Sequence, residues 1–206
     1  MAMRFKTQFT PPAKTLARQL LGAKFSPAQL AAAVGAPDNA QVSFSVDAFG
    51  RLKAIVHHPL LVAQERVLFR DQRGDLVIRN QYLEKQPFAP RDTGIRLFQI
   101  QVEAAQKLGV KRINTIGAGS LGDEHIGYYL MARYGFDAPL DDRDLILLRN
   151  WLPTVRTLNE LIEAGGKQWL KEFGREKEMV FHLAPESSMM RVFRAYLAEL
   201  KAQRRL

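Results

Sequence analysis

The chain has 206 residues, of which 47% are hydrophobic and 25% charged, a balance typical of one globular domain with a substantial core. It contains no cysteine, which excludes disulfides, thiolate zinc sites and a cysteine nucleophile. Its net charge of +9 favours polyanionic partners, whether nucleic acid, anionic lipid or a phosphorylated cofactor.

The sequence predicts a protein that is not inserted in a membrane. No apolar run approaches the ~20 residues that a membrane helix needs, and the start of the chain lacks the apolar core of a signal peptide. Five basic residues precede the first acid, Asp38: Arg4, Lys6, Lys14, Arg18 and Lys24. We expect a cytoplasmic protein, or one exported without a conventional signal peptide.

The first third of the chain predicts two short helices followed by four strands. One helix covers 13–22, and another begins after Ser26, a good N-cap followed by proline, and ends near Gly35. Alternating apolar and polar residues then predict strands at 41–46, 52–58, 62–70 and 75–83, separated by the turns 48–51 and 71–74. Tight turns between consecutive strands favour an antiparallel meander.

The order then changes to a helix at about 94–108, a strand at about 111–116 and a helix at about 124–134. Parallel pairing of the strands around the first of these helices would make a right-handed crossover. We expect an α+β (mixed α/β) fold, with a central mixed sheet flanked by helices, and a first domain covering residues 1–140.

Residues 141–206 are predicted to be a mainly helical extension packed on that domain. Candidate helices cover 142–151, 155–164 and 167–173, and 179–183 is a candidate strand at the sheet edge. The final helix shows one apolar face, formed by Met189, Met190, Phe193, Tyr196, Leu197 and Leu200.

The segment Arg91-Asp-Thr-Gly94-Ile-Arg96 predicts an anion-binding site. It lies between a strand and the N-terminus of a long helix, where unpaired backbone N–H groups and the helix dipole favour a negative charge. We expect the phosphate of a ligand to bind there.

The same segment resembles the GNAT superfamily of N-acetyltransferases. The resemblance rests on Arg-x-x-Gly-x-Arg from Arg91 to Arg96, the following helix and strand, and the later Arg133-Tyr-Gly-Phe136. It covers about residues 40 to 140. Arg96 stands where that family usually has glycine or alanine, so its side chain either adds a phosphate contact or obstructs the close approach of the cofactor.

The resemblance implies an acetyl-CoA site. The pyrophosphate would contact the amides of Asp92, Thr93, Gly94, Ile95 and Arg96, and Arg91 would belong to the same cofactor site. The pantetheine would pair with backbone groups of Gln81, Tyr82 and Leu83, between splayed strands. The reaction would be direct transfer of the acetyl group to an amine acceptor, with no covalent enzyme intermediate and no metal.

The resemblance also suggests catalytic groups. Glu84, at the end of a strand, is the candidate general base that takes a proton from the amine. Tyr128 and Tyr129 are candidate general acids for the departing thiolate, although the family position corresponds to Met131. Core packing is the alternative role for each tyrosine, and a solvated strand end is the alternative for Glu84.

A second glycine motif, Gly117-Ala-Gly119-Ser-Leu-Gly122, has the pattern of a dinucleotide fingerprint. The rest of a parallel sheet is missing after it, which favours a substrate-side loop instead. Asp123, Glu124 and His125 follow as another polar cluster, or as first-turn residues of a helix. No set of residues has metal-ligand spacing.

The sequence therefore predicts an acyl-CoA-dependent N-acyltransferase acting on an amine-bearing small molecule or protein. A non-catalytic, protein-binding module with the same fold is one alternative. A second is acetylation of an aminoacyl-tRNA amine. The RNA backbone would then be bound by the N-terminal cations and by Arg191, Arg194, Lys201, Arg204 and Arg205.

Overall fold

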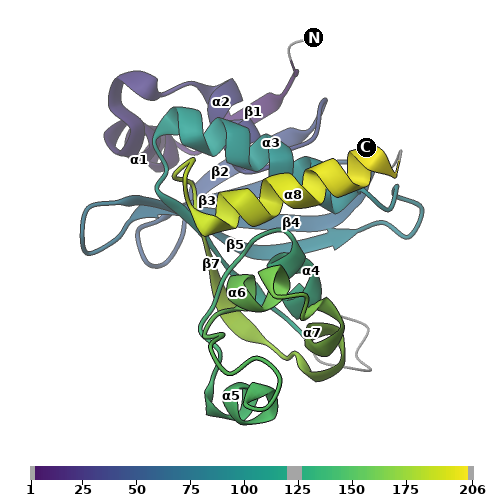
Figure 1. Cartoon of the computed structure of the whole chain (residues 1–206). Helices are drawn as coiled ribbons and strands as arrows, with labels where there is room; N and C mark the ends of the chain where they lie inside the picture. The colour runs from purple at the N-terminus through teal and green to yellow at the C-terminus, as the bar shows by residue number, and fades with distance from the viewer. Residues whose placement is uncertain (1–2, 120–126, 204–206) are drawn as a thin grey trace. The chain divides into compact units, whose positions relative to one another are not determined.

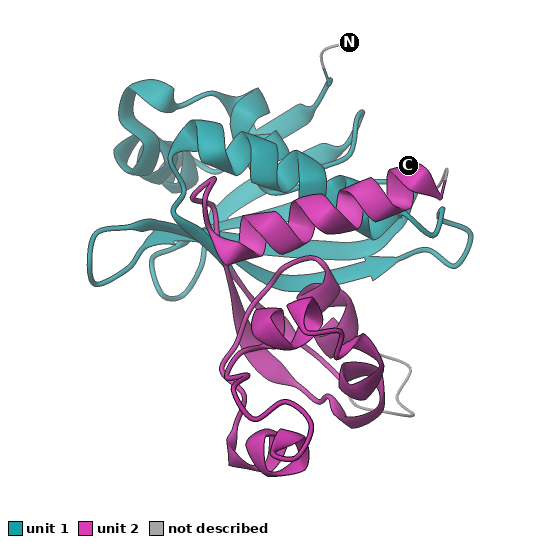
Figure 2. Ribbon diagram, in the orientation of Figure 1, with its two compact units in different colours: residues 1–113 teal, residues 114–206 magenta. Residues whose placement is uncertain are grey.

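The fold is mixed α+β, as the sequence predicts. A computed structural model describes residues 3–119 and 127–203, which contain seven β-strands and eight α-helices. They divide into two compact units, Met1–Ile113 and Asn114–Leu206 (Figure 2). The division falls inside strand β6 (Arg112–Gly117), whereas the sequence placed a domain boundary after residue 140.

The first unit is built on a sheet whose strands follow one another in chain order. These strands are β1 (Lys6–Phe9), β2 (Gln41–Val46), β3 (Leu52–His57), β4 (Leu61–Arg70) and β5 (Leu76–Lys85). β2 to β5 form the expected antiparallel meander. β1, which runs parallel to β2, was not predicted, because its four residues are too few to display a period.

Two hairpin turns of the meander have the same construction. Asp47 accepts hydrogen bonds from the amides of Phe49 and Arg51, and Asp71 accepts them from Arg73 and Asp75, all at 2.9 Å. In both turns a glycine with positive φ follows three residues after the aspartate. Aspartate side chains stabilise such turns by bonding the amides of the residues that follow, and both turns lie where the sequence predicts them.

Three α-helices belong to the first unit: α1 (Pro11–Leu21), α2 (Pro27–Ala33) and α3 (Thr93–Leu108). A 3-10 turn, η1 (Gly22–Lys24), follows α1. Ser26 caps α2 as expected, and Gly109 ends α3 in the left-handed conformation, at φ 80°. Figure 1 shows α3 lying along the sheet beside α1 and α2.

Buried amide side chains join two of these helices to the sheet. Gln64 of β4 donates to the carbonyls of Val34 (2.6 Å) and Gly35 (3.1 Å), directly after α2. Asn80 of β5 and Gln101 of α3 exchange two hydrogen bonds, of 3.0 and 2.8 Å. The end of α2 and the middle of α3 therefore cover the same face of β4 and β5.

The second unit contains most of β6, the strand β7 (Lys177–His182) and five helices. The helices are α4 (Gly127–Arg133), α5 (Asp142–Leu148), α6 (Leu158–Glu163), α7 (Lys167–Phe173) and α8 (Ser188–Ala202). All had been expected, although α5 and α6 are shorter than predicted and β7 begins two residues earlier. The periodic apolar positions extend into the flanking turns, where Val155 is also buried.

The core of the second unit is aromatic. Phe181 of β7 packs against Phe136 and Phe193, with ring centroids 5.4 and 5.8 Å apart. Gly135 ends α4 at φ 92°, and a Cβ there would lie 2.3 Å from the carbonyl oxygen of Met189. Glycine is therefore required between Tyr134 and Phe136, where the chain turns to bury Phe136.

An ion network connects α5 with β7. Lys177 lies 2.8 Å from Asp144 and 2.6 Å from Asp141, and Arg175 lies 2.5 Å from Asp141. Asp144 is 2% exposed. Because the buried carboxylate of Asp144 has the Lys177 ammonium beside it, the network offsets the desolvation of that charge.

None of the helices in the described ranges combines the length and the apolar character needed to cross a bilayer.

Candidate functional site

The turn between β5 and α3 is held rigidly to the first unit. The amide of Gln86 donates to the carbonyl of Leu60 (3.0 Å), and the Lys85 ammonium donates to the carbonyl of Arg91 (3.3 Å). The amide of Thr93 donates to the carbonyl of Pro90 (3.0 Å). These bonds fix the position at which α3 begins.

The first turn of α3 presents backbone donors that the described residues leave open. Asp92 is the N-cap residue, yet its carboxylate does not cap the helix and instead accepts a bond from the Arg96 guanidinium. No acceptor in the described ranges bonds the amides of Gly94 and Ile95. Since Arg91 and Arg96 are both exposed beside these amides, the turn has the features of an anion site.

Strand β5 carries a bulge at Gln81. Glu65 of β4 lies opposite Tyr82 and the next residue, Arg66, lies opposite Asn80, so Gln81 has no partner across the ladder. A bulge leaves the main-chain groups of the extra residue outside the regular pairing. The regular geometry of β5 is thus interrupted at the residues expected to pair with pantetheine, which are Gln81, Tyr82 and Leu83.

A buried arginine stabilises this bulge. Arg66 is 4% exposed, and its guanidinium donates to the carbonyls of Tyr82 (2.5 Å) and Glu65 (2.9 Å). Burial lowers the pKa of Arg66 to about 9, so the group is still a cation at neutral pH. Its Nε has no partner, and no carboxylate in the described ranges forms an ion pair with it.

Tyr82 and Glu84 form a pair on the strand next to the bulge. The Tyr82 hydroxyl donates to the Glu84 carboxylate, and this bond raises the pKa of Tyr82. Both side chains are exposed. The pair was missed in the sequence, although residues two apart on a strand share a face and the spacing could have indicated it.

The two tyrosines expected to act as acids occupy different environments in α4. Tyr128 is 1% exposed, and its hydroxyl donates to the carbonyl of Lys171 at 2.8 Å. Tyr129 is half-buried, with the Arg133 guanidinium 5.7 Å from its ring centroid. The hydroxyl of Tyr128 is therefore used to connect α4 with α7, the core-packing role that the sequence left open.

Part of the second glycine motif lies outside the described residues. Gly117 and Ala118 are described, as is Gly119 with φ 90°, whereas Ser120 and Gly122 are not. Asp123, Glu124 and His125 also lie outside them. In the described ranges no three histidine, aspartate or glutamate side chains come together as metal ligands.

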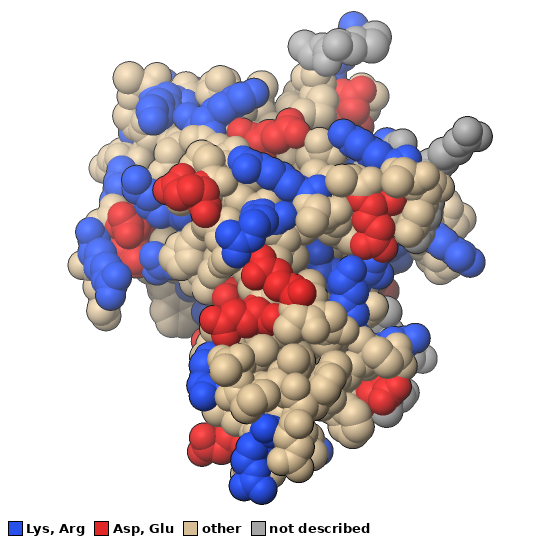
Figure 3. Space-filling model, in the orientation of Figure 1, with Lys and Arg blue, Asp and Glu red and all other residues tan. Residues whose placement is uncertain are grey.

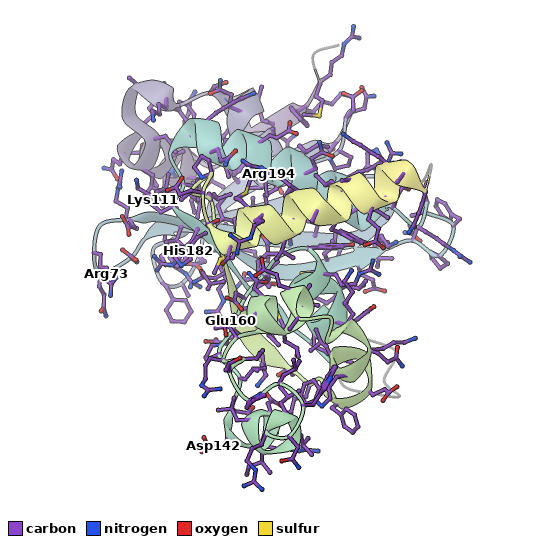
Figure 4. All side chains as sticks on the ribbon, in the orientation of Figure 1. Arg73, Lys111, Asp142, Glu160, His182 and Arg194 are labelled. Atoms are coloured by element: carbon purple, nitrogen blue, oxygen red, sulfur yellow. The ribbon has the colours of Figure 1, made fainter. Side chains whose placement is uncertain are left out.

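The cations proposed to bind RNA belong to different units. Arg4, Lys6, Lys14, Arg18 and Lys24 are in the first unit, where Lys6 begins β1. In the second unit Arg191 is paired with Glu163 at 2.8 Å, while Arg194 and Lys201 are exposed on α8 (Figure 4 labels Arg194). Arg204 and Arg205 lie outside the described residues.

The chain matches no model of a known protein family, and a search of curated proteins found no match either. The geometry of the first unit is therefore the basis for a functional proposal.

Proposed function

We propose that the first unit binds a coenzyme A thioester and that the chain transfers the acyl group to an amine. One observation carries this proposal: open helix amides at Gly94 and Ile95, flanked by Arg91 and Arg96, follow a strand with a bulge at Gln81. Phosphate and pantetheine are the parts of coenzyme A that these two features suit.

The start of α3 would bind the pyrophosphate. Its open amides point away from the helix, and the helix dipole adds a partial positive charge at the same place. Arg91 and Arg96 can each bond phosphate oxygens through two N–H groups. The Arg96 guanidinium would leave the Asp92 carboxylate and bond the phosphate, because its exposed side chain can turn toward either group.

The bulge would bind the pantetheine arm. The arm contains two amide groups, which can pair with a strand backbone as an added peptide strand does. Gln81 has no partner on β4, whereas the carbonyl of Tyr82 is already bonded by Arg66. We therefore assign the pairing to Gln81 and Leu83.

Glu84 would act as the general base, with Tyr82 orienting its carboxylate. The acceptor nitrogen forms a bond to the acyl carbon, the carbon–sulfur bond breaks, and coenzyme A leaves as the thiolate. Glu84 takes the proton that the nitrogen loses, directly or through water. The thiolate then takes a proton from solvent.

Isothermal titration with coenzyme A tests the binding site. Arg91→Ala should weaken binding about tenfold, since a hydrogen bond to a charged group contributes roughly 1.5 kcal/mol. Arg73→Ala is the matched control, because Arg73 is an exposed arginine of the same unit in the turn after β4 (Figure 4). Absence of binding at millimolar coenzyme A would disprove the proposal.

Turnover of acetyl-CoA with a panel of amines tests the chemistry. Glu84→Gln should leave coenzyme A affinity unchanged and reduce turnover by about 100-fold or more, the usual contribution of a general base. Equal loss of binding and turnover would assign Glu84 to the cofactor instead.

A binding module without catalysis is the second candidate. It is favoured by Tyr128, whose hydroxyl is bonded to a main-chain carbonyl and is not presented to a substrate. Under this alternative coenzyme A still binds, Arg91→Ala still weakens it, and no amine in the panel is acetylated. The two experiments together therefore separate the candidates.

A further inference from the structure

Three large apolar side chains are exposed together around the end of α5. Ile146 is 70% exposed, Leu147 47% and Trp151 54%. We call these three residues the Trp151 patch. Large apolar side chains are usually buried, whereas α5 buries only Asp144 and Leu148, and these three remain exposed.

The backbone holds the patch together beyond the end of the helix. The amides of Trp151 and Leu152 both donate to the carbonyl of Leu148, at 2.9 and 2.8 Å. Trp151 follows Leu147 by four residues, a spacing that places two side chains on the same side of a helical turn. The ion network of Asp141 and Asp144 with Lys177 anchors the other side of α5.

The patch is bordered by cations. Arg143 and Arg149 are exposed on either side of Ile146 and Leu147, and Asp142 is an exposed acid beside them. Figure 4 labels Asp142 at the end of the second unit that carries α5, and Figure 3 shows lysine or arginine atoms beside uncharged ones at that end. A tryptophan with leucine, isoleucine and arginine is the composition of a surface that lies at a lipid interface.

We propose that the Trp151 patch docks the chain onto an anionic lipid surface. The apolar side chains would enter the boundary between head groups and acyl chains, and Arg143 and Arg149 would contact lipid phosphates. Charge argues against a second copy as the occupant, because two patches face to face would bring together four arginines and only two aspartates, in a chain of net charge +9. A nucleic acid would match the arginines but would leave Ile146 and Leu147 exposed to water.

Sedimentation with vesicles of phosphatidylcholine, with and without phosphatidylglycerol, tests this inference on the full chain. The protein should bind the anionic vesicles and release them as salt is raised. Trp151→Ala should lower the vesicle partition constant by about tenfold or more, because burial of an aromatic side chain contributes at least the roughly 1.4 kcal/mol of a tenfold change. Arg143→Gln with Arg149→Gln should reduce binding to anionic vesicles alone.

Phe49→Ser is the matched control. Phe49 is 80% exposed at a hairpin turn of the first unit and should leave vesicle binding unchanged. The chain has two tryptophans, so Trp169→Phe makes Trp151 the one fluorophore of its kind, and its emission should shift to the blue on anionic vesicles.

Three results would overturn the inference. They are no sedimentation at low salt, sedimentation that Trp151→Ala leaves unchanged, and concentration-dependent dimers that Trp151→Ala abolishes. The last would assign the patch to a second copy of the chain. Loss of coenzyme A binding bears only on the first unit and leaves this inference untouched.

Discussion

The two units differ in how they satisfy a buried cation. In the second unit Lys177 lies between the carboxylates of Asp141 and Asp144, and each charge offsets the desolvation of the others. In the first unit Arg66 is more deeply buried than Lys177 but bonds only main-chain carbonyls beside the bulge of β5. The difference indicates that Lys177 maintains the fold, whereas Arg66 holds a strand in an irregular shape at the place where we propose that the pantetheine arm binds.

The tyrosines of the two units repeat this contrast. Tyr128 is buried and its hydroxyl bonds a main-chain carbonyl, whereas Tyr82 is exposed and its hydroxyl bonds the carboxylate of Glu84. Since both residues are tyrosines, the difference in burial alone decides which hydroxyl is accessible from solvent.

The largest effect should come from Lys177→Met. It leaves the carboxylate of Asp144, which is 2% exposed, without its ammonium partner and should lower the free energy of unfolding by about 3–5 kcal/mol. Urea unfolding followed by circular dichroism measures this loss. Lys171→Met, on an exposed side chain of α7, is the control, and adding Asp144→Asn to Lys177→Met should recover part of the loss.

Tyr128→Phe and Tyr82→Phe should separate stability from activity. Tyr128→Phe leaves the carbonyl of Lys171 without this donor and should cost about 1–3 kcal/mol of unfolding free energy. Tyr82→Phe should change stability by less than about 0.5 kcal/mol and slow acyl transfer. Loss of turnover at unchanged stability in Tyr128→Phe would contradict the structural role of Tyr128.

Arg66→Met should have a smaller effect on stability than Lys177→Met. Removal of a buried charge is favourable, but the carbonyls of Tyr82 and Glu65 lose their donor, and the opposed effects should leave a destabilisation of no more than about 2 kcal/mol. Coenzyme A affinity should fall because the bulge is no longer held. A stability loss above that of Lys177→Met would contradict the distinction between the two cations.

The smallest effect should be the acid sensitivity contributed by Asp141. Burial raises the pKa of this carboxyl, but the hydrogen bond from Lys177, the amide of Asp144 and the charge of Arg175 together lower it well below its usual range. A carboxylate with a depressed pKa stabilises the fold above the unfolded-state pKa of about 4 and loses this contribution as the pH falls below it.

Asp141→Asn should therefore lower the free energy of unfolding at pH 7 by about 1 kcal/mol, a modest value because the side chain is partly exposed. Asparagine keeps the helix cap, so the change isolates the charge. The difference in unfolding free energy between Asp141→Asn and the unsubstituted chain should narrow below about pH 4. Asp142→Asn, at the exposed next residue, should have the same unfolding free energy as the unsubstituted chain at every pH.

Local signals predicted the elements well. The caps Ser26 and Gly109, the turns of the meander and the alternation of β2 and β3 all reappear in the structure, because each acts over a few residues. The alternation expected in β5 does not, because Leu76, Val77 and Ile78 are all buried there. Strand β1 was missed because it pairs with β2, more than thirty residues away, and has no period of its own. The strand, the turn and the helix start that were expected to bind an anion are present, and the ligand stays a prediction.

The residues of the candidate site were predicted less completely. Arg91, Gly94 and Arg96 were identified because a strand, a turn and a helix start are adjacent in the sequence. Arg66 was not identified. Its importance comes from its burial and from its hydrogen bond to the bulge of β5, the neighbouring strand of the sheet. The pairing of Tyr82 with Glu84 required the register of β5 to be known.

The sequence by itself determined the order and type of the elements after β1, the turns of the meander and the helix start at residues 91–96, because propensity, capping and periodicity act between near neighbours. Only the tertiary structure decided that Tyr128 is committed to Lys171, that Arg66 is buried without a carboxylate and that Trp151 is left exposed. These facts depend on which distant surfaces exclude water from a side chain, and no local pattern encodes that.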